Sequence, residues 1–301
     1  MRETVYYQRG AADPILENSL ALDIVRRYAP SAGEVRQIDE TGGEARVYAI
    51  DDNIILKVQR PQQLRSSTSL EKEAFFLRQL EQRTDVSAPR VLGYGRRDTV
   101  EYICMSRMPG VAAERVKLSR EEKHDLLLIL GAELRKIHSL DQRPFIDSGL
   151  FPRDEPADLP ERLRRRYENA IRNSNATRNN SAIRNNSAIR NDSATSEDKK
   201  ARALNQLAEI LLRIGNAGGF VALHVNPYIP HVFVDETTHK YTGVIDFGDS
   251  YIGHPIFDMW YWSAPSRNTL LRGYTAEKPV SEEFQMVFDA ASAVSKLVGD
   301  L

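Results

Sequence analysis

The sequence predicts an α+β fold, with a small antiparallel β-sheet in its N-terminal third and a larger, mainly helical part after it. Between residues 34 and 105, short apolar segments alternate with turn residues, which is typical of strands. One amphipathic helix, at 69–82, interrupts these strands, and a longer one follows at 119–138. We therefore expect a five-stranded sheet that is complete by Met105.

In chain order, the first expected element is a helix over 14–28, where apolar residues lie at roughly helical spacing before Pro30. The helix at 119–138 opens with a capping box at 119–122 and ends at His138, which we interpret as a structural histidine. Strands are expected at 35–38, 46–50, 54–58, 89–95 and 102–105.

Composition excludes several classes of partner. The 41 basic and 42 acidic residues nearly cancel, so the chain has no strong field for nucleic acid or an anionic membrane. No apolar run is long enough to span a bilayer, and the first residues carry no secretion signal. The single cysteine, Cys104, is expected to be a buried thiol. We expect a cytoplasmic protein, and the sequence does not indicate its oligomeric state.

Two features of the N-terminal part point toward phosphate chemistry. Gly42 and Gly43 lie between two predicted strands, where a turn can bring backbone N–H groups close to an anion, although such a hairpin is more often only a turn. Lys57 lies in an otherwise apolar strand and therefore needs a partner for its charge. In the helix at 69–82, Glu73 lies next to the apolar face, whereas Glu71 and Lys72 lie away from it.

The densest group of polar residues lies between 223 and 258. A strand at 242–245 runs directly into Asp246 and Asp249, and carboxylates at a strand end suit a hard divalent cation. His224, Asn226 and His231 lie on a polar loop before a second strand at 232–234. Because two such strands form a hairpin, we expect these polar residues to converge on one site.

These residues resemble the motifs of the aminoglycoside phosphotransferase family, which includes choline-kinase-like enzymes and is related to the protein kinases. That family carries H-G-D-x-x-x-x-N, then I-D-F-x-D, then D-P-x-x-D. Asp246 and Asp249 match the second motif. In the first, His224 matches the histidine, but Asn226 replaces the catalytic aspartate and His231 replaces the metal-binding asparagine.

The resemblance implies a bilobal, protein-kinase-like fold. Residues 1–106 would form the N-terminal ATP-binding lobe, and residues 107–301 the C-terminal catalytic and substrate lobe. The segment 108–110 is similar to the hinge that holds adenine through backbone groups, so Met105 and Arg107 beside it are candidate cofactor-binding residues.

The resemblance also assigns roles around the ATP phosphates. Gly42 and Gly43 would cover them, Lys57 would bind them, and Glu73 would hold Lys57. Glu73 begins an E-A-x-x-L-x-x-L run that is similar to the corresponding family helix, and the alternative is a solvated surface glutamate.

For the metal and the chemistry, the resemblance implies that Asp246 binds Mg²⁺, with Asp249 as an outer or second-metal carboxylate. Asp258 would hold the loop that carries His224. His224 is one of the candidate catalytic residues, with Asn226 and His231, and would act as a loop anchor. Asn226 can orient a hydroxyl but cannot accept its proton.

His231 has three open interpretations. It could ligate a metal, although nitrogen suits Mn²⁺ or Zn²⁺ better than Mg²⁺. It could act as a replacement base, because an imidazole titrates near neutral pH. It could also be a structural residue of the loop.

A six-residue repeat, N-N-S-A-I-R, occupies 179–184 and 185–190. Its polar composition cannot offset the entropy of ordering, so we predict a disordered insertion at about 172–198, between helices at 159–171 and 200–214.

Two functions remain open. The first is an ATP- and Mg²⁺-dependent transfer of phosphate to a hydroxyl of a small molecule of the aminoglycoside, macrolide or choline type, with Mn²⁺ as an alternative ion. The second is a catalytically impaired relative, a pseudokinase that binds nucleotide or a small ligand. A protein kinase is disfavoured, because no activation segment ending in A-P-E is present. The substrate wall is expected at 260–301, where four carboxylates either meet a cationic sugar or belong to a solvated face: Glu277, Glu282, Glu283 and Asp289.

Overall fold

The structure is a computed structural model. It describes residues 16–39, 44–60, 69–83, 85–97, 100–155, 158–159, 161–162, 165, 219–260 and 262–299. Gly42 and Gly43 lie outside these residues, as does the predicted insertion at 172–198. Nearly all of the helix predicted at 159–171, and the whole of the one predicted at 200–214, lie outside them too. Within the described part of the chain, no helix is long and apolar enough to cross a membrane.

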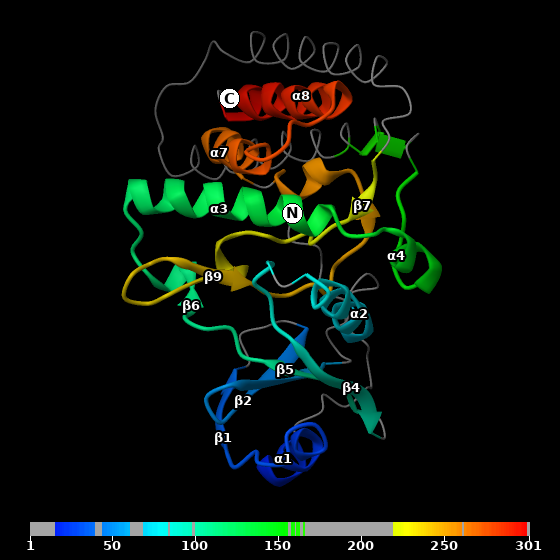
Figure 1. Ribbon diagram of the computed structural model, residues 1–301, viewed down its shortest axis with the longest axis vertical. Helices are drawn as coiled ribbons and strands as arrows, with labels where there is room; N and C mark the ends of the chain where they lie inside the picture. The colour runs from blue at the N-terminus through cyan, green and yellow to red at the C-terminus, as the bar shows by residue number, and fades with distance from the viewer. Residues whose placement is uncertain are drawn as a thin grey trace, which may run out of the picture.

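A five-stranded antiparallel sheet forms one end of the molecule (Figure 1). Its strands, in the spatial order β1-β2-β3-β5-β4, match the five predicted segments. The bounds are β1 (Val35–Asp39), β2 (Ala45–Ile50), β3 (Ile54–Gln59), β4 (Val91–Arg97) and β5 (Val100–Ser106).

Strand alternation separates the two faces of this sheet. Leu56 and Val58 of β3 face α1 (Asn18–Arg26) and are buried with its apolar residues. Lys57, between them, faces the opposite side. That side carries α2 (Leu70–Leu80), whose N-terminus is capped by the Ser69 hydroxyl. The sheet therefore presents Lys57 to the rest of the molecule.

The remainder is mainly helical, with short strands in two small sheets (Figure 1). The long helix α3 (Arg120–His138) begins with the predicted capping box, in which both reciprocal bonds form. Within the described residues, further helices are α4 (Arg143–Ser148), α7 (Ala264–Tyr274) and α8 (Glu282–Gly299), with 3₁₀ turns η2 (Ala113–Arg115), η4 (Ile229–His231) and η5 (Pro255–Asp258). Strands β6 (Val111–Ala112), β8 (Val232–Val234) and β9 (Tyr241–Val244) form one small sheet, and β7 (Val221–Ala222) pairs with β10 (Ile252–Gly253).

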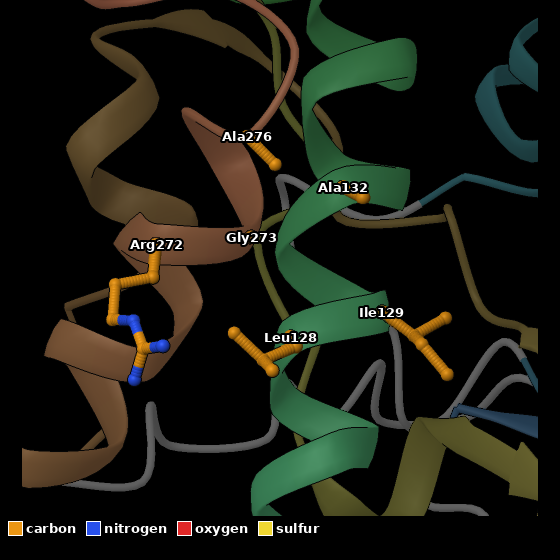
Figure 2. Close-up of a pocket in the computed structure, with 6 residues that line it drawn as sticks. All are labelled: Leu128, Ile129, Ala132, Arg272, Gly273 and Ala276. Atoms are coloured by element: carbon orange, nitrogen blue, oxygen red, sulfur yellow. The ribbon is translucent and has the colours of Figure 1, made fainter.

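Helices α3 and α7 pack at backbone contact through a pair of glycines. A Cβ on Gly273 would lie 2.0 Å from the Leu128 carbonyl oxygen, and one on Gly131 would lie 2.1 Å from the Leu270 oxygen. A methyl group at either glycine would therefore push the two helices apart. Figure 2 shows the open apolar pocket beside this contact. None of the predicted site residues lines it; its lining residues are Leu128, Ile129, Ala132, Arg272, Gly273 and Ala276.

The substitution Gly273→Ala tests this contact. Glycine to alanine inside a helix normally stabilises by about 1 kcal/mol, but here the added methyl group should destabilise by about 1–3 kcal/mol. Urea unfolding would measure the change, with Arg272→Ala on the exposed side of the same turn as a control that should shift stability by less than about 0.5 kcal/mol. A stabilised Gly273→Ala variant would contradict the close approach of the helices.

Candidate active site

A half-buried ammonium group lies at the centre of the candidate site. Lys57 Nζ is 2.8 Å from Glu73 Oε2 on α2 and 2.7 Å from Asp246 Oδ1 after β9. Burial alone would lower the pKa of Lys57, but the two carboxylates raise it well above its usual value. The structure therefore brings together Lys57, Glu73 and Asp246, and Lys57 is charged.

Asp246 occupies an unusual backbone conformation immediately after β9. Its φ is +74°, in the left-handed region that residues other than glycine rarely adopt. Burial raises the pKa of its carboxyl group. The charges of Lys57 and His231 lower this pKa by more than burial raises it, so the net pKa is far below its usual range. Asp246 is therefore an ionised carboxylate held in a strained position, which is common at functional sites.

Helix α2 is fastened to the turn that follows Asp246. The Ser69 amide donates to Gly248 O at 3.3 Å, and Lys72 Nζ donates to Ser250 O at 2.8 Å. Lys72 is only 4% exposed, so the expectation that it lies away from the buried face was wrong. The turn covers this part of the helix, and it comes from a segment 178 residues further along the chain.

Asp258 holds the loop that carries His224. Its Oδ2 accepts the His224 amide at 2.9 Å, and its Oδ1 accepts the Val225 amide at 2.6 Å. Val225 has a φ of +81°, so these bonds stabilise a strained backbone. His138 Nε2 lies 2.8 Å from the same Oδ2, and because a carboxylate oxygen only accepts, the ring donates. His138 is thus buried at the end of α3 as a support for Asp258.

His224 uses both ring nitrogens on backbone groups. Its Nε2 lies 2.9 Å from Ile245 O, which can only accept, and its Nδ1 accepts the Asn226 amide at 3.3 Å. Complete burial lowers the pKa of His224 to about 4, so the ring is neutral near pH 7. Neither nitrogen is left to exchange a proton with a substrate, and the geometry is that of a loop anchor.

Asn226 points its amide group at a carboxylate. Its Nδ2 donates to Asp249 Oδ2 at 2.7 Å. A carboxylate at position 226 would meet Asp249 at the same distance, where two negative charges repel each other. Asn226 is therefore matched to the observed position of Asp249. The spacing of these residues in the sequence gave no signal of this contact.

His231, the last residue of η4, links the two loops of the site. Its Nδ1 lies 2.8 Å from the Asn226 backbone oxygen, and its Nε2 lies 3.3 Å from Asp246 Oδ2. The His231 carbonyl also accepts the Ile245 amide at 3.0 Å, which fixes the loop against the end of β9.

Residues 34–278 match the family described as the phosphotransferase enzyme family, APH. The chain belongs to this family. None of the curated proteins matches it.

Solved structures with a similar fold are distant in sequence. They include the GDP complex of wild-type aminoglycoside 2'-phosphotransferase-IIIa, with a TM-score of 0.61, 13% identity and coverage of 93% of this chain and 88% of that one. Another is macrolide 2'-phosphotransferase MphH from Brachybacterium faecium, with a TM-score of 0.56, 18% identity and coverage of 91% and 89%. The streptomycin–ATP–APH(2")-IIa ternary complex has a TM-score of 0.52, 18% identity and coverage of 87% and 83%. These likenesses confirm the predicted α+β, kinase-like fold.

The remaining candidate residues of this family member are less informative. Met105 is buried in β5, and the Arg107 amide already donates to Asn53 O at 2.8 Å, so it is not available to a nucleotide base. Glu277, Glu282, Glu283 and Asp289 are all exposed. Within the described residues, no group of three His, Cys, Asp or Glu side chains is arranged to hold a metal ion by itself.

His254 is buried as well, after His138 and His224. Its Nδ1 accepts the Ile256 amide at 3.2 Å, and its ring stacks on Phe284 with centroids 5.5 Å apart. Burial, and to a lesser degree the charge of His138, lower the pKa of His254 to about 4. His224 and His254 therefore both fold as neutral rings.

These depressed pKa values predict that the protein loses stability in mild acid. In the unfolded chain, His224 and His254 bind protons below about pH 6.5, the usual pKa of histidine. In the folded chain they bind protons only near pH 4. The contribution of these neutral rings to the free energy of unfolding is thus complete above pH 6.5. As the pH falls toward 4, protonation of each ring in the unfolded chain should lower the free energy of unfolding by up to about 1.4 kcal/mol per pH unit. Urea unfolding at pH 7.5 and 5.0 would measure this loss.

The variant His254→Asn keeps a side chain that can cap η5 but removes one titrating ring, so its loss between the two pH values should be smaller. Phe284→Leu weakens the same packing and keeps the ring, so it should lower stability at both pH values by a similar amount. Equal pH slopes in the wild type and His254→Asn would contradict the assignment.

Proposed function

We propose that this family member transfers the γ-phosphoryl group of ATP to a hydroxyl group of a small molecule. The observation that carries the proposal is the Lys57 ammonium, bonded at once to Glu73 and to Asp246. A partly buried cation between a helix carboxylate and a strand-end carboxylate suits phosphate transfer, because catalysis there consists of positioning and charge neutralisation.

The residues present suit a nucleotide with a divalent ion. Asp246 is ionised, and Lys57 occupies only its Oδ1, so its Oδ2 is directed elsewhere. Such an ion supplies charge neutralisation on the transferred phosphate when it is bound, and Mg²⁺ and Mn²⁺ are the candidates. The similar structures that contain GDP or ATP support nucleotide binding, and the one that contains streptomycin supports a small-molecule acceptor.

Each chain segment then has a task. Residues 1–106 form the nucleotide lobe, in which Lys57 binds phosphate, Glu73 orients Lys57, and Gly42 and Gly43 cover the phosphates. Residues 107–301 form the lobe that binds the acceptor. At the hinge, Met105 and Arg107 lie beside the adenine, with backbone groups other than the Arg107 amide making the contact. Because the donor is ATP, the protein would work in the cytoplasm.

The acceptor hydroxyl meets an amide where the family pattern has an aspartate. Asn226 can accept a hydrogen bond from this hydroxyl through its side-chain oxygen, since its Nδ2 is occupied by Asp249. Without a general base the rate falls by about 10²- to 10⁴-fold, which predicts a slow enzyme. We propose an aminoglycoside, a macrolide or a choline-like alcohol as the acceptor, and the exposed carboxylates of 277–289 suit a cationic one.

Asn226 also supports a second candidate function. A protein that retains Lys57, Glu73 and Asp246 can bind nucleotide without transferring phosphate efficiently. This pseudokinase would use the same residues for binding alone.

ATP turnover with Mg²⁺ and with Mn²⁺, across a panel of aminoglycosides, macrolides and choline-like alcohols, separates the two functions. We expect slow, acceptor-dependent turnover by the wild type that falls at least about 10²-fold in Asp246→Ala, because positioned charge is lost. Turnover that survives Asp246→Ala would contradict the proposal.

The contact between Asn226 and Asp249 allows a sharper variant than Asn226→Asp alone, which would place two carboxylates against each other. The exchange Asn226→Asp with Asp249→Asn keeps one amide and one carboxylate in the pair. This double variant should raise turnover by about 10²- to 10⁴-fold over the wild type, because a base returns to the loop. No turnover in the wild type with turnover in the double variant would establish the pseudokinase.

A further inference from the structure

The tautomer of His231 is determined by its hydrogen bond. Nδ1 lies 2.8 Å from the Asn226 carbonyl oxygen, and because a carbonyl only accepts, Nδ1 carries the hydrogen. In the neutral ring, the lone pair is then on Nε2. Metal-binding histidines are commonly oriented in this way, with one ring N–H donated to a backbone carbonyl and the other nitrogen facing the metal.

The free side of this ring faces a carboxylate oxygen. Nε2 lies 3.3 Å from Asp246 Oδ2, while Lys57 occupies the other oxygen of the same carboxylate at 2.7 Å. Two acceptor atoms that face each other need either a proton or a metal ion between them. A proton in this position would make His231 a cation that pairs with the carboxylate.

The separation of the two atoms favours the metal ion. A charge-assisted N–H to O bond is typically about 2.7–2.9 Å long, and the observed 3.3 Å is longer. Two ligand atoms about 2.1 Å from a common ion, at an angle of 90–110°, are about 3.0–3.4 Å apart. The observed spacing falls in this range.

We propose that His231 Nε2 and Asp246 Oδ2 together ligate the divalent ion that accompanies the nucleotide, and that the nitrogen ligand makes the site prefer Mn²⁺ to Mg²⁺. Imidazole binds transition ions better than Mg²⁺, whereas the carboxylate and phosphate oxygens suit both ions. Within the described residues, no group of three His, Cys, Asp or Glu side chains is arranged to hold the ion alone, so the ion is held jointly with nucleotide phosphate. The inference therefore rests on the proposed function.

A nitrogen ligand to Mn²⁺ can be observed directly. Pulsed electron paramagnetic resonance of the full chain with Mn²⁺ and ADP should show modulation from one directly bound ¹⁴N. The modulation should disappear in His231→Asn, which offers an oxygen in its place. It should persist in His239→Asn, a control that removes a histidine paired with a different carboxylate, Glu122, at 2.9 Å.

The affinity for ADP gives a second readout that needs no acceptor. By calorimetry, the wild type should bind ADP at least about tenfold more tightly with Mn²⁺ than with Mg²⁺. His231→Asn should lose most of this ratio while still binding ADP, and His239→Asn should keep it.

Three results would overturn the inference. Mn²⁺ and ADP that bind without ¹⁴N modulation would show that His231 pairs with Asp246 through a proton. An unchanged affinity ratio in His231→Asn would remove the selectivity. Absence of ADP binding with either ion would contradict both this inference and the proposed function, whereas the first two results leave the proposed function intact.

Discussion

The whole site depends on the Lys57 ammonium. Its side chain is 16% exposed and bonds to two carboxylates that come from different parts of the chain. A charge with so little access to water is costly unless it is paired. The interaction therefore requires β3, α2 and the loop after β9 to be assembled together. The bonds from Ser69 and Lys72 to the turn at 248–250 hold α2 in the same position.

The strained backbone of the site is supported in the same way by buried polar groups. Asp246 and Val225 both have left-handed φ values, which cost energy for residues with a Cβ. At Val225 the cost is offset by Asp258, whose two oxygens accept the amides of Val225 and His224. His138 fixes Asp258 in turn, so the end of α3 determines where the candidate catalytic loop lies.

The sequence could predict those features that depend on residues close together in the chain, but not contacts between residues far apart in it. The strands, the capping box of α3 and the choice of Glu73 were readable, because each depends on residues close together in the chain or on alternation within one element. The burial of Lys72 was not, since the turn that covers it lies 178 residues away and periodicity reports only the face toward the sheet. The contact of Asn226 with Asp249 was also missed, because sequence spacing places residues at a loop but does not orient their side chains.

The two departures from the family motifs belong to one polar network. Asp249 Oδ2 accepts from the Asn226 side chain, the Asn226 carbonyl accepts from His231 Nδ1, and His231 Nε2 faces Asp246 Oδ2. The two carboxylates of the I-D-F-x-D motif are thus linked through the two substituted positions. Residues in one polar network do not contribute additively. A carboxylate at 226 would repel Asp249 and shift the peptide group that sets the tautomer of His231. If the proposed function holds, Asn226 acts on the metal site as well as on the acceptor, and its contribution to catalysis is coupled to that of His231.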